Sequence, residues 1–146
     1  MKKVCIIGLG YIGLPTAALF ASHGMQVVGV DINTQIIETI NNGGVHIQEV
    51  GLPELVRAAQ VMGNLHIDSQ PQESDAFIIT VPTPFYDDKR ADMRAVTAAA
   101  EAILPHLREG NLVMLESPSP LRTTTRLSLT LMHHFQCEGG FDNEVL

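Results

Sequence analysis

The sequence predicts an α/β fold, in which helices cover both faces of a parallel sheet. An apolar, β-branched run at residues 4–7 leads into a glycine turn and then a helical pattern. A second apolar strand follows one helix later, at residues 26–30, and strands and helices go on alternating. With right-handed crossovers, this pattern indicates a single-domain, doubly wound sheet of the Rossmann type with strand order 3-2-1-4-5.

Composition is typical of one globular domain. The chain has 146 residues, of which 45% are hydrophobic and 17% charged, enough to build a core. Its net charge is −7 and its nine lysines and arginines are scattered, so we expect no nucleic-acid partner. Two cysteines, Cys5 and Cys137, form no disulfide framework. A reducing, cytoplasmic location is therefore expected.

The N-terminal segment imitates a secretion signal, because two lysines precede an uncharged stretch at residues 4–22. Three glycines and Pro15 interrupt this stretch, which argues against a continuous membrane helix. We expect no membrane partner.

The glycine turn follows a recognisable spacing, G-x-G-x-x-G, at Gly8, Gly10 and Gly13. The first glycine permits a tight turn, the second lets the backbone approach a pyrophosphate, and the third lets the helix pack closely on the strand. The helix that starts here points its N–H groups and positive dipole end at the phosphates. Tyr11 and Ile12 lie inside this turn and are included in the predicted site.

Asp31 ends the second strand, 18 positions after Gly13, near the spacing of about 20 expected for an acid that binds an adenosine ribose. Its carboxylate would accept hydrogen bonds from both ribose hydroxyls and repel a 2′-phosphate, so NAD is favoured over NADP. The alternative is that Asp31 only caps the next helix. Asn33, which starts that helix, is included in the predicted site.

The first two helices have clear boundaries. The first is predicted at Tyr11 to His23, with Pro15 in its first turn and Gly24 after its end. The second runs from Asn33, a typical N-cap, to about Ile40.

Weaker signals mark the middle of the chain. A third helix is predicted from Pro53 to about Val61, and a third strand at 65–67. The fourth strand, at 76–81, is strongly apolar and ends in Pro82, which cannot extend a ladder.

The C-terminal part continues the alternation. Asp92 is expected to cap a helix that runs through Ile103. A fifth strand is predicted at 111–115 and a last helix from Leu121 to Phe135. We therefore predict a nucleotide-binding domain at 1–135 and leave the tail at 136–146 unassigned.

The ends of the fourth and fifth strands complete the predicted site, because ligands of open α/β sheets bind at the carboxyl edge of the strands. The hydroxyl of Thr83 is expected to contact the cofactor, the alternative being a plain turn. Glu116 is expected to bond the nicotinamide-side ribose or to cap the next helix. The predicted residues at these two strand ends are Val81, Pro82, Thr83, Glu116 and Ser117.

These motifs carry a family resemblance. The segments 8–15, 30–33, 81–84 and 116–117, in this order, resemble the N-terminal NAD-binding domain of the UDP-glucose/GDP-mannose dehydrogenase family over roughly residues 3 to 131. The resemblance implies oxidation of a UDP-sugar C6 alcohol to a uronate, with UDP-N-acetylmannosamine as the sugar nucleotide.

The same resemblance implies that this chain has no catalytic residue. The family's catalytic thiolate, lysine and aspartate come from a segment beyond position 146, as does the domain that binds the sugar nucleotide. We expect the isolated chain to lack catalysis, and a UDP-sugar to bind only if that domain is supplied.

Pro118 departs from the family pattern, which carries threonine at this position. This favours an alternative, a non-catalytic NAD-binding remnant or module. A third reading is another Rossmann enzyme, such as a β-hydroxyacid dehydrogenase or a methyltransferase.

Two acidic or histidine-rich groups are better explained without a metal. His133, His134 and Cys137 lie on one helix end with no fourth ligand, and Asp87, Asp88 and Asp92 fit a solvated loop and a cap. We predict no metal site.

Self-association is the remaining expectation. By resemblance, chain beyond this domain covers the fifth-strand side of the sheet and provides dimer contacts. The apolar strand at 112–115 would otherwise lie at an uncovered edge, which invites pairing with another chain.

Overall fold

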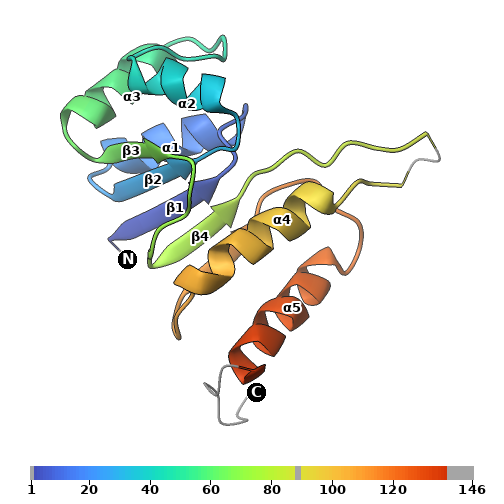
Figure 1. Ribbon diagram of the computed structural model, residues 1–146. Coiled ribbons are helices and arrows are strands. Elements are labelled where there is room, and N and C mark those ends of the chain that lie inside the picture. Colours follow the sequence, from blue (N-terminus) through green and yellow to red (C-terminus); the bar gives the residue numbers. More distant parts are fainter. Residues whose placement is uncertain (1, 88–89, 138–146) are drawn as a thin grey trace.

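The computed structural model describes residues 2–87 and 90–137, the last four by their backbone. Helices and strands alternate along the chain (Figure 1). Their bounds are β1 (Lys3–Ile7), α1 (Gly13–Ser22), β2 (Gln26–Val30), α2 (Thr34–Asn41), α3 (Leu52–Val61), β3 (Leu65–Asp68), β4 (Ala76–Ile79), α4 (Arg94–Ile103), the 3₁₀ turn η1 (Leu104–His106), β5 (Leu112–Leu115) and α5 (Thr123–Cys137).

The five strands form one parallel sheet in the order β3-β2-β1-β4-β5, which confirms the predicted topology. Because β1 and β4 are neighbours in the sheet but not in the chain, the strand order switches direction between them. All carboxyl ends point to the same edge of the sheet, and α1, α2 and α3 gather on one face while α4 and α5 lie on the other (Figure 1).

Alternate residues of the central strands supply two separate cores. On the face of α1 to α3, Val4 and Ile6 of β1 pack with the small residues Ala17, Ala18 and Ala21. On the other face, Cys5 and Ile7 join residues of β4, α4 and α5. The central strands are therefore buried on both faces, which explains why their sequences are continuously apolar.

Several predicted boundaries were wrong by two residues. Helix α1 begins at Gly13 because Tyr11 and Ile12 complete the turn, and β4 ends at Ile79 rather than Val81. Helix α5 begins at Thr123, since Arg122 adopts φ 67° and this left-handed conformation interrupts a helix.

Asp92 was expected to cap α4; its carboxylate does bond the first backbone N–H of the helix, but Asp92 does not occupy the N-cap position. The N-cap is Met93, which makes no side-chain cap. The Asp92 carboxylate accepts the Arg94 backbone N–H at 3.0 Å and pairs with the Arg94 guanidinium at 2.6 Å. These bonds hold the pKa of the Asp92 carboxyl well below its usual range.

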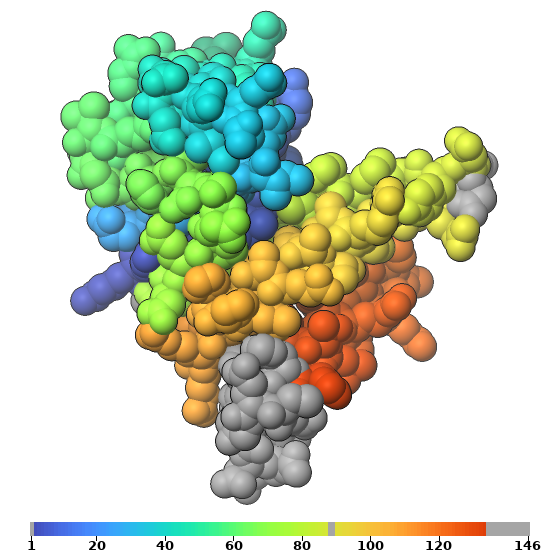
Figure 2. All heavy atoms as spheres, viewed as in Figure 1, coloured from blue at the N-terminus to red at the C-terminus, as the bar shows by residue number. Residues whose placement is uncertain are grey.

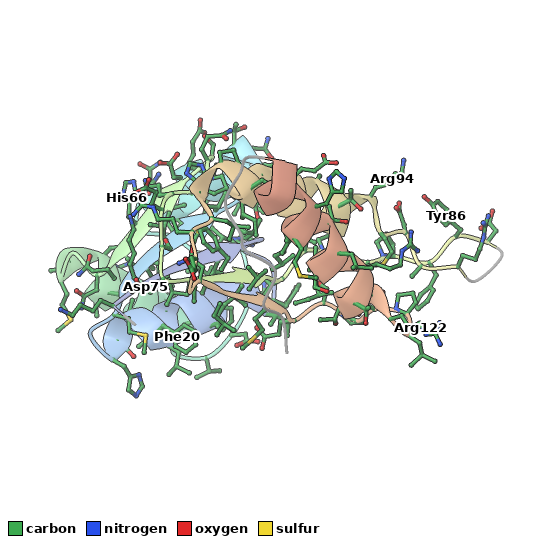
Figure 3. All side chains as sticks on the ribbon, turned by 90° about the horizontal axis from the view of Figure 1, so that it is seen from below. Phe20, His66, Asp75, Tyr86, Arg94 and Arg122 are labelled. Carbon is green, nitrogen blue, oxygen red and sulfur yellow. The ribbon has the colours of Figure 1, made fainter. Side chains whose placement is uncertain are left out.

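A narrow arm, residues 83–92 without 88–89, projects from the body beyond β4 (Figure 2). An antiparallel bridge joins Phe85 to Ala91, and the Tyr86 N–H donates to the Arg90 carbonyl at 2.8 Å. The Arg94 guanidinium lies 5.9 Å from the centre of the Tyr86 ring, at the base of the arm (Figure 3).

Strand β5 is the edge of the sheet and is only partly covered. Val113 and Leu115 pack on the face of α4 and α5, whereas Leu112 is 46% and Met114 43% exposed on the opposite face. Leu129 of α5 is also exposed. Apolar surface is thus left open along this edge.

Among the described helices, none is long and apolar enough to cross a membrane.

Candidate functional site

The glycine turn connects β1 to α1 at the carboxyl edge of the sheet. Gly8 adopts φ 96°, and its N–H donates to the Val30 carbonyl of β2 at 2.8 Å. A Cβ on Gly13 would lie 1.8 Å from the Gly8 carbonyl oxygen, so the helix start presses directly on the turn. Internal packing therefore requires glycine at positions 8 and 13.

Gly10 differs from both of its partners in the motif. Its φ is not positive, and a Cβ placed on it would meet no atom of the described chain within 4 Å. Neither strain nor packing inside the protein calls for glycine here. The open space at Gly10 lies at the start of α1, whose Leu14 N–H donates back to the Gly10 carbonyl at 3.1 Å. A backbone left bare in this way suits close approach of a ligand.

Two other residues of the turn, Tyr11 and Ile12, point away from the core. Tyr11 is 71% and Ile12 54% exposed, unusual for side chains of their size. Helix α1 has no side-chain cap and no acidic residue in its first turn. Its N-terminus therefore keeps its positive end unneutralised, next to the open space at Gly10.

Asp31 stands at the end of β2 beside the glycine turn. One carboxylate oxygen accepts the Leu9 N–H at 2.9 Å, and the other accepts the Asn33 N–H at 2.9 Å. Asn33 itself caps α2, its side chain accepting the Gln35 N–H at 3.0 Å. Asp31 thus lies against the turn rather than serving as the helix cap, and each oxygen retains a lone pair.

Two hydroxyl groups tie the loop after β4 to the loop after β5. Ser117, which is buried, donates to the Val81 carbonyl at 2.6 Å. Thr83 donates to the Pro118 carbonyl at 2.6 Å, so its proton is already used within the protein. The two loops therefore form one connected rim.

Val81, another predicted residue of this rim, is half-buried and packs against the core on the side of α4 and α5. Pro82 and Glu116 are both exposed. The alternative expectation that Glu116 caps the next helix is wrong, because α5 begins seven positions later, at Thr123.

Thr80 follows β4 directly and was not among the predicted site residues. Its hydroxyl oxygen lies 2.7 Å from the Gly8 carbonyl oxygen and 3.0 Å from that of Ile7. The only signal in the sequence was a hydroxyl residue one position before the predicted site residue Val81, inside a stretch assigned to the strand.

The thiol of Cys5, the cysteine whose side chain the structure describes, is unsuited to covalent chemistry at this edge. Cys5 is fully buried in β1, and burial raises the pKa of its thiol to about 11.

Among the described residues, no cluster of three His, Cys, Asp or Glu side chains is placed to hold a metal. Asp88 and the side chains of His134 and Cys137 lie outside the described part.

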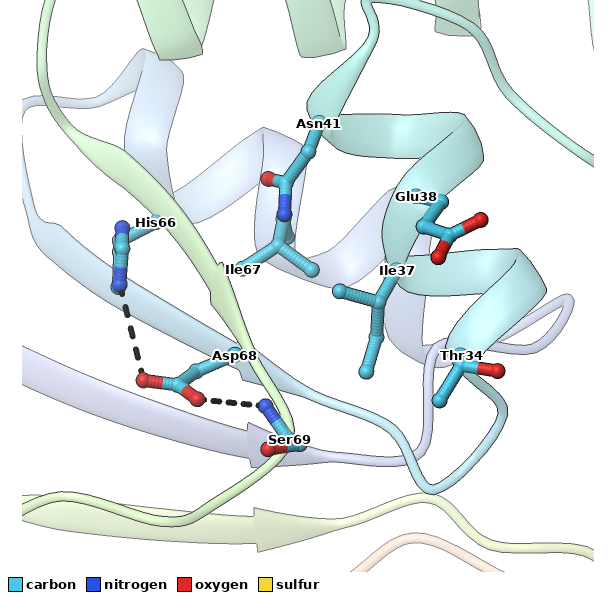
Figure 4. A pocket seen from close by; sticks show the side chains of 8 residues that line it. All are labelled: Thr34, Ile37, Glu38, Asn41, His66, Ile67, Asp68 and Ser69. Carbon is cyan, nitrogen blue, oxygen red and sulfur yellow. Dashed lines mark hydrogen bonds and ion pairs between the residues drawn. The ribbon is translucent and has the colours of Figure 1, made fainter.

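A separate shallow pocket of about 410 Å³ opens between α2 and β3 (Figure 4). His66 and Asp68 face each other across 3.7 Å on its strand side, and Glu38 lies on its helix side. The Ser69 N–H, donating at 2.6 Å, lowers the pKa of Asp68. None of the predicted site residues lines this pocket.

Comparison with known proteins identifies relatives of the whole described fold. The model of the UDP-glucose/GDP-mannose dehydrogenase family, NAD binding domain, matches residues 2–146. The NDP-N-acetyl-D-galactosaminuronic acid dehydrogenase of Ralstonia nicotianae is 50% identical over 127 residues, covering 87% of this chain and 30% of that protein. The UDP-N-acetyl-D-mannosamine dehydrogenase of Campylobacter jejuni is 51% identical over 128 residues, covering 87% and 31%.

A solved structure agrees with these matches. The UDP-N-acetyl-mannosamine dehydrogenase of Staphylococcus aureus superimposes with a TM-score of 0.89 at 40% identity, covering 92% of this chain and 33% of that one. The chain therefore spans about a third of the length of the relatives it matches.

Proposed function

Because the chain belongs to the UDP-glucose/GDP-mannose dehydrogenase family and matches its NAD-binding domain, we propose that NAD binds along the carboxyl edge of its sheet. The observation that carries this proposal is the bare backbone at Gly10, which nothing in the described protein fills. The uncapped start of α1 next to it supplies the positive end that a pyrophosphate requires. Tyr11 and Ile12, exposed beside Gly10, would cover the phosphates.

Asp31 is proposed to select NAD over NADP. Its oxygens are fixed in direction by the Leu9 and Asn33 N–H groups, and each keeps a lone pair for one ribose hydroxyl. A 2′-phosphate would bring a second negative group against this carboxylate, which is unfavourable. Asn33 would line the same ribose pocket.

Replacing Asp31 by alanine should weaken NAD binding by about 1–3 kcal/mol, because the ribose hydroxyls lose a charged acceptor. Calorimetric titration of the wild-type chain should show tighter binding of NAD than of NADP. Asp68→Ala is a matched control, since Asp68 ends the neighbouring strand β3 and accepts the Ser69 N–H. Equal binding of NADP by the wild type would contradict the role of Asp31.

The rim after β4 and β5 is proposed to hold the nicotinamide half of the cofactor. The hydroxyl bonds of Thr83 and Ser117 fix the two loops against each other. Exposed Glu116 would accept a hydroxyl of the second ribose, and Val81 and Pro82 would pack against the ring. When bound, NAD would accept a hydride at its nicotinamide ring, and these residues would orient that ring.

For the whole protein, we propose a nucleotide-sugar 6-dehydrogenase that oxidises a UDP-sugar, with UDP-N-acetylmannosamine as the proposed substrate. The names of the relatives support an N-acetylated hexosamine. The isolated chain is proposed to bind NAD without turnover, since its described thiol, Cys5, is buried and protonated at neutral pH. The UDP-sugar would bind only with a C-terminal domain, and NAD-linked chemistry with a reduced thiol fits a cytoplasmic location.

A second function, a non-catalytic NAD-binding module, is favoured by Pro118. This residue has no hydroxyl to offer a substrate or water, and its carbonyl is engaged by Thr83. The cofactor site is the same in both proposals.

Self-association through the β5 edge is proposed for the isolated chain, because Leu112 and Met114 are exposed beside an unpaired strand edge. Met114→Lys should shift the apparent mass measured by light scattering during size exclusion towards the monomer. Val61→Lys, at an exposed apolar residue of α3, is the control and should change nothing. A wild-type chain that stays monomeric at high concentration would contradict this proposal.

A further inference from the structure

Thr80 joins β4 to the glycine turn through its backbone and its side chain. Its N–H donates to the Ile7 carbonyl at 2.8 Å, as a continuation of the β1–β4 ladder. Its hydroxyl lies 2.7 Å from the Gly8 carbonyl oxygen and 3.0 Å from that of Ile7. One proton is shared between these carbonyls, and the shorter distance favours Gly8.

The crowding at both structural glycines involves this residue. A Cβ on Gly13 would lie 2.5 Å from the Thr80 hydroxyl oxygen, and one on Gly8 would lie 2.9 Å from the Thr80 carbonyl oxygen. The hydroxyl therefore occupies the narrow space between the first peptide of the turn and the start of α1. Its reach is limited to groups inside the turn.

The turn is held from both sides at consecutive groups. On the β2 side, the Gly8 N–H donates to Val30 and the Leu9 N–H donates to Asp31. On the β4 side, the Gly8 carbonyl accepts the hydroxyl of Thr80. The peptide between Gly8 and Leu9 is thus clamped at both its oxygen and its nitrogen.

We propose that Thr80 is a positioning residue for cofactor binding: its hydroxyl holds the Gly8 carbonyl and fixes the turn that receives the pyrophosphate. This role rests on the proposed NAD site at the same edge. Without the hydroxyl, the Gly8–Leu9 peptide is held at its nitrogen alone, and the bare backbone at Gly10 that follows it is less firmly positioned. A ligand would then have to order the turn as it binds, which weakens binding.

The test compares Thr80→Val, which removes the hydroxyl at nearly constant shape, with Thr80→Ser, which keeps it. Thr97→Val is the matched control, because the Thr97 hydroxyl donates to the Met93 carbonyl on an exposed turn of α4. NAD dissociation constants are measured by calorimetry and stability by thermal unfolding. We expect Thr80→Val to bind NAD about tenfold more weakly or worse, and Thr80→Ser and Thr97→Val to bind like the wild type.

Three outcomes would overturn this role. A lower unfolding temperature of Thr80→Val with an unchanged dissociation constant would show that the hydroxyl is merely structural. Weak NAD binding by a folded Thr80→Ser would show that the methyl group, not the hydroxyl, matters. A wild-type chain that binds no NAD contradicts the proposed function itself, and this role with it. If Thr80→Val does not fold, Thr80→Ala takes its place against the same serine variant.

Discussion

Gly13→Ala is expected to destabilise the fold and abolish NAD binding. The new Cβ would lie 1.8 Å from the Gly8 carbonyl oxygen. Neither atom can move aside, because the Gly8 backbone is fixed by β1 and the Gly13 backbone by α1. Relief requires helix α1 to move away from the sheet, which breaks the packing of its small residues. We expect a loss of about 3 kcal/mol or more, at the upper end for overpacked sites. Thermal unfolding followed by circular dichroism measures it.

Gly63→Ala separates this steric effect from backbone strain. Gly63 adopts φ 74°, but a Cβ there would meet nothing within 4 Å. Its replacement should cost only the strain of a left-handed residue, about 1–2 kcal/mol. If Gly13→Ala unfolds at the same temperature as Gly63→Ala, the close approach of α1 to the turn is not a determinant of stability.

Gly10→Ala should leave the unfolding temperature unchanged and yet weaken NAD binding by about tenfold to a hundredfold. The methyl group meets no atom of the described chain, and alanine is unstrained at this φ. The methyl group would instead occupy the space that we propose for the pyrophosphate of NAD, and 1.4 kcal/mol corresponds to a factor of ten in the dissociation constant.

The two glycine variants are expected to differ in their effect on stability, although both should weaken NAD binding. Gly13→Ala loses stability and binding together, whereas Gly10→Ala loses binding alone. Calorimetric titration with NAD after a check of the unfolding curve distinguishes them. Normal NAD affinity in Gly10→Ala would place the pyrophosphate elsewhere and remove the main support for the proposed site.

The topology of this fold was predictable because its strongest signals are local and periodic. Apolar runs mark β1, β2 and β4, and Gly24 and Asn33 mark helix ends by their own chemistry. The start of α5 was harder to locate, because a proline-containing turn is followed by a second residue that interrupts the helix. That residue is Arg122, and nothing in its chemistry announces the left-handed φ that delays α5.

The hydrogen-bond partners of the site residues were less predictable than the location of those residues at the edge of the sheet. Asp31 and the three motif glycines lie at the expected edge, but the bonds of Asp31 to Leu9 and Asn33 depend on strand pairing. Likewise, the partner of Thr83 is Pro118, 35 positions away. Thr80 was overlooked because a strand pattern treats threonine as one more β-branched residue, while its role comes from the neighbouring strand.

The strand order has a thermodynamic consequence. The proposed cofactor would lie across the reversal between β1 and β4, with one half on β1 and β2 and the other on β4 and β5. The β5 side ends in an edge strand with exposed apolar side chains, so its local unfolding costs less free energy. A ligand that contacts both halves penalises that opening by mass action, by about 2.7 kcal/mol at a hundredfold excess over its dissociation constant. For the isolated chain, proteolysis within this half of the domain should therefore become slower as NAD is added.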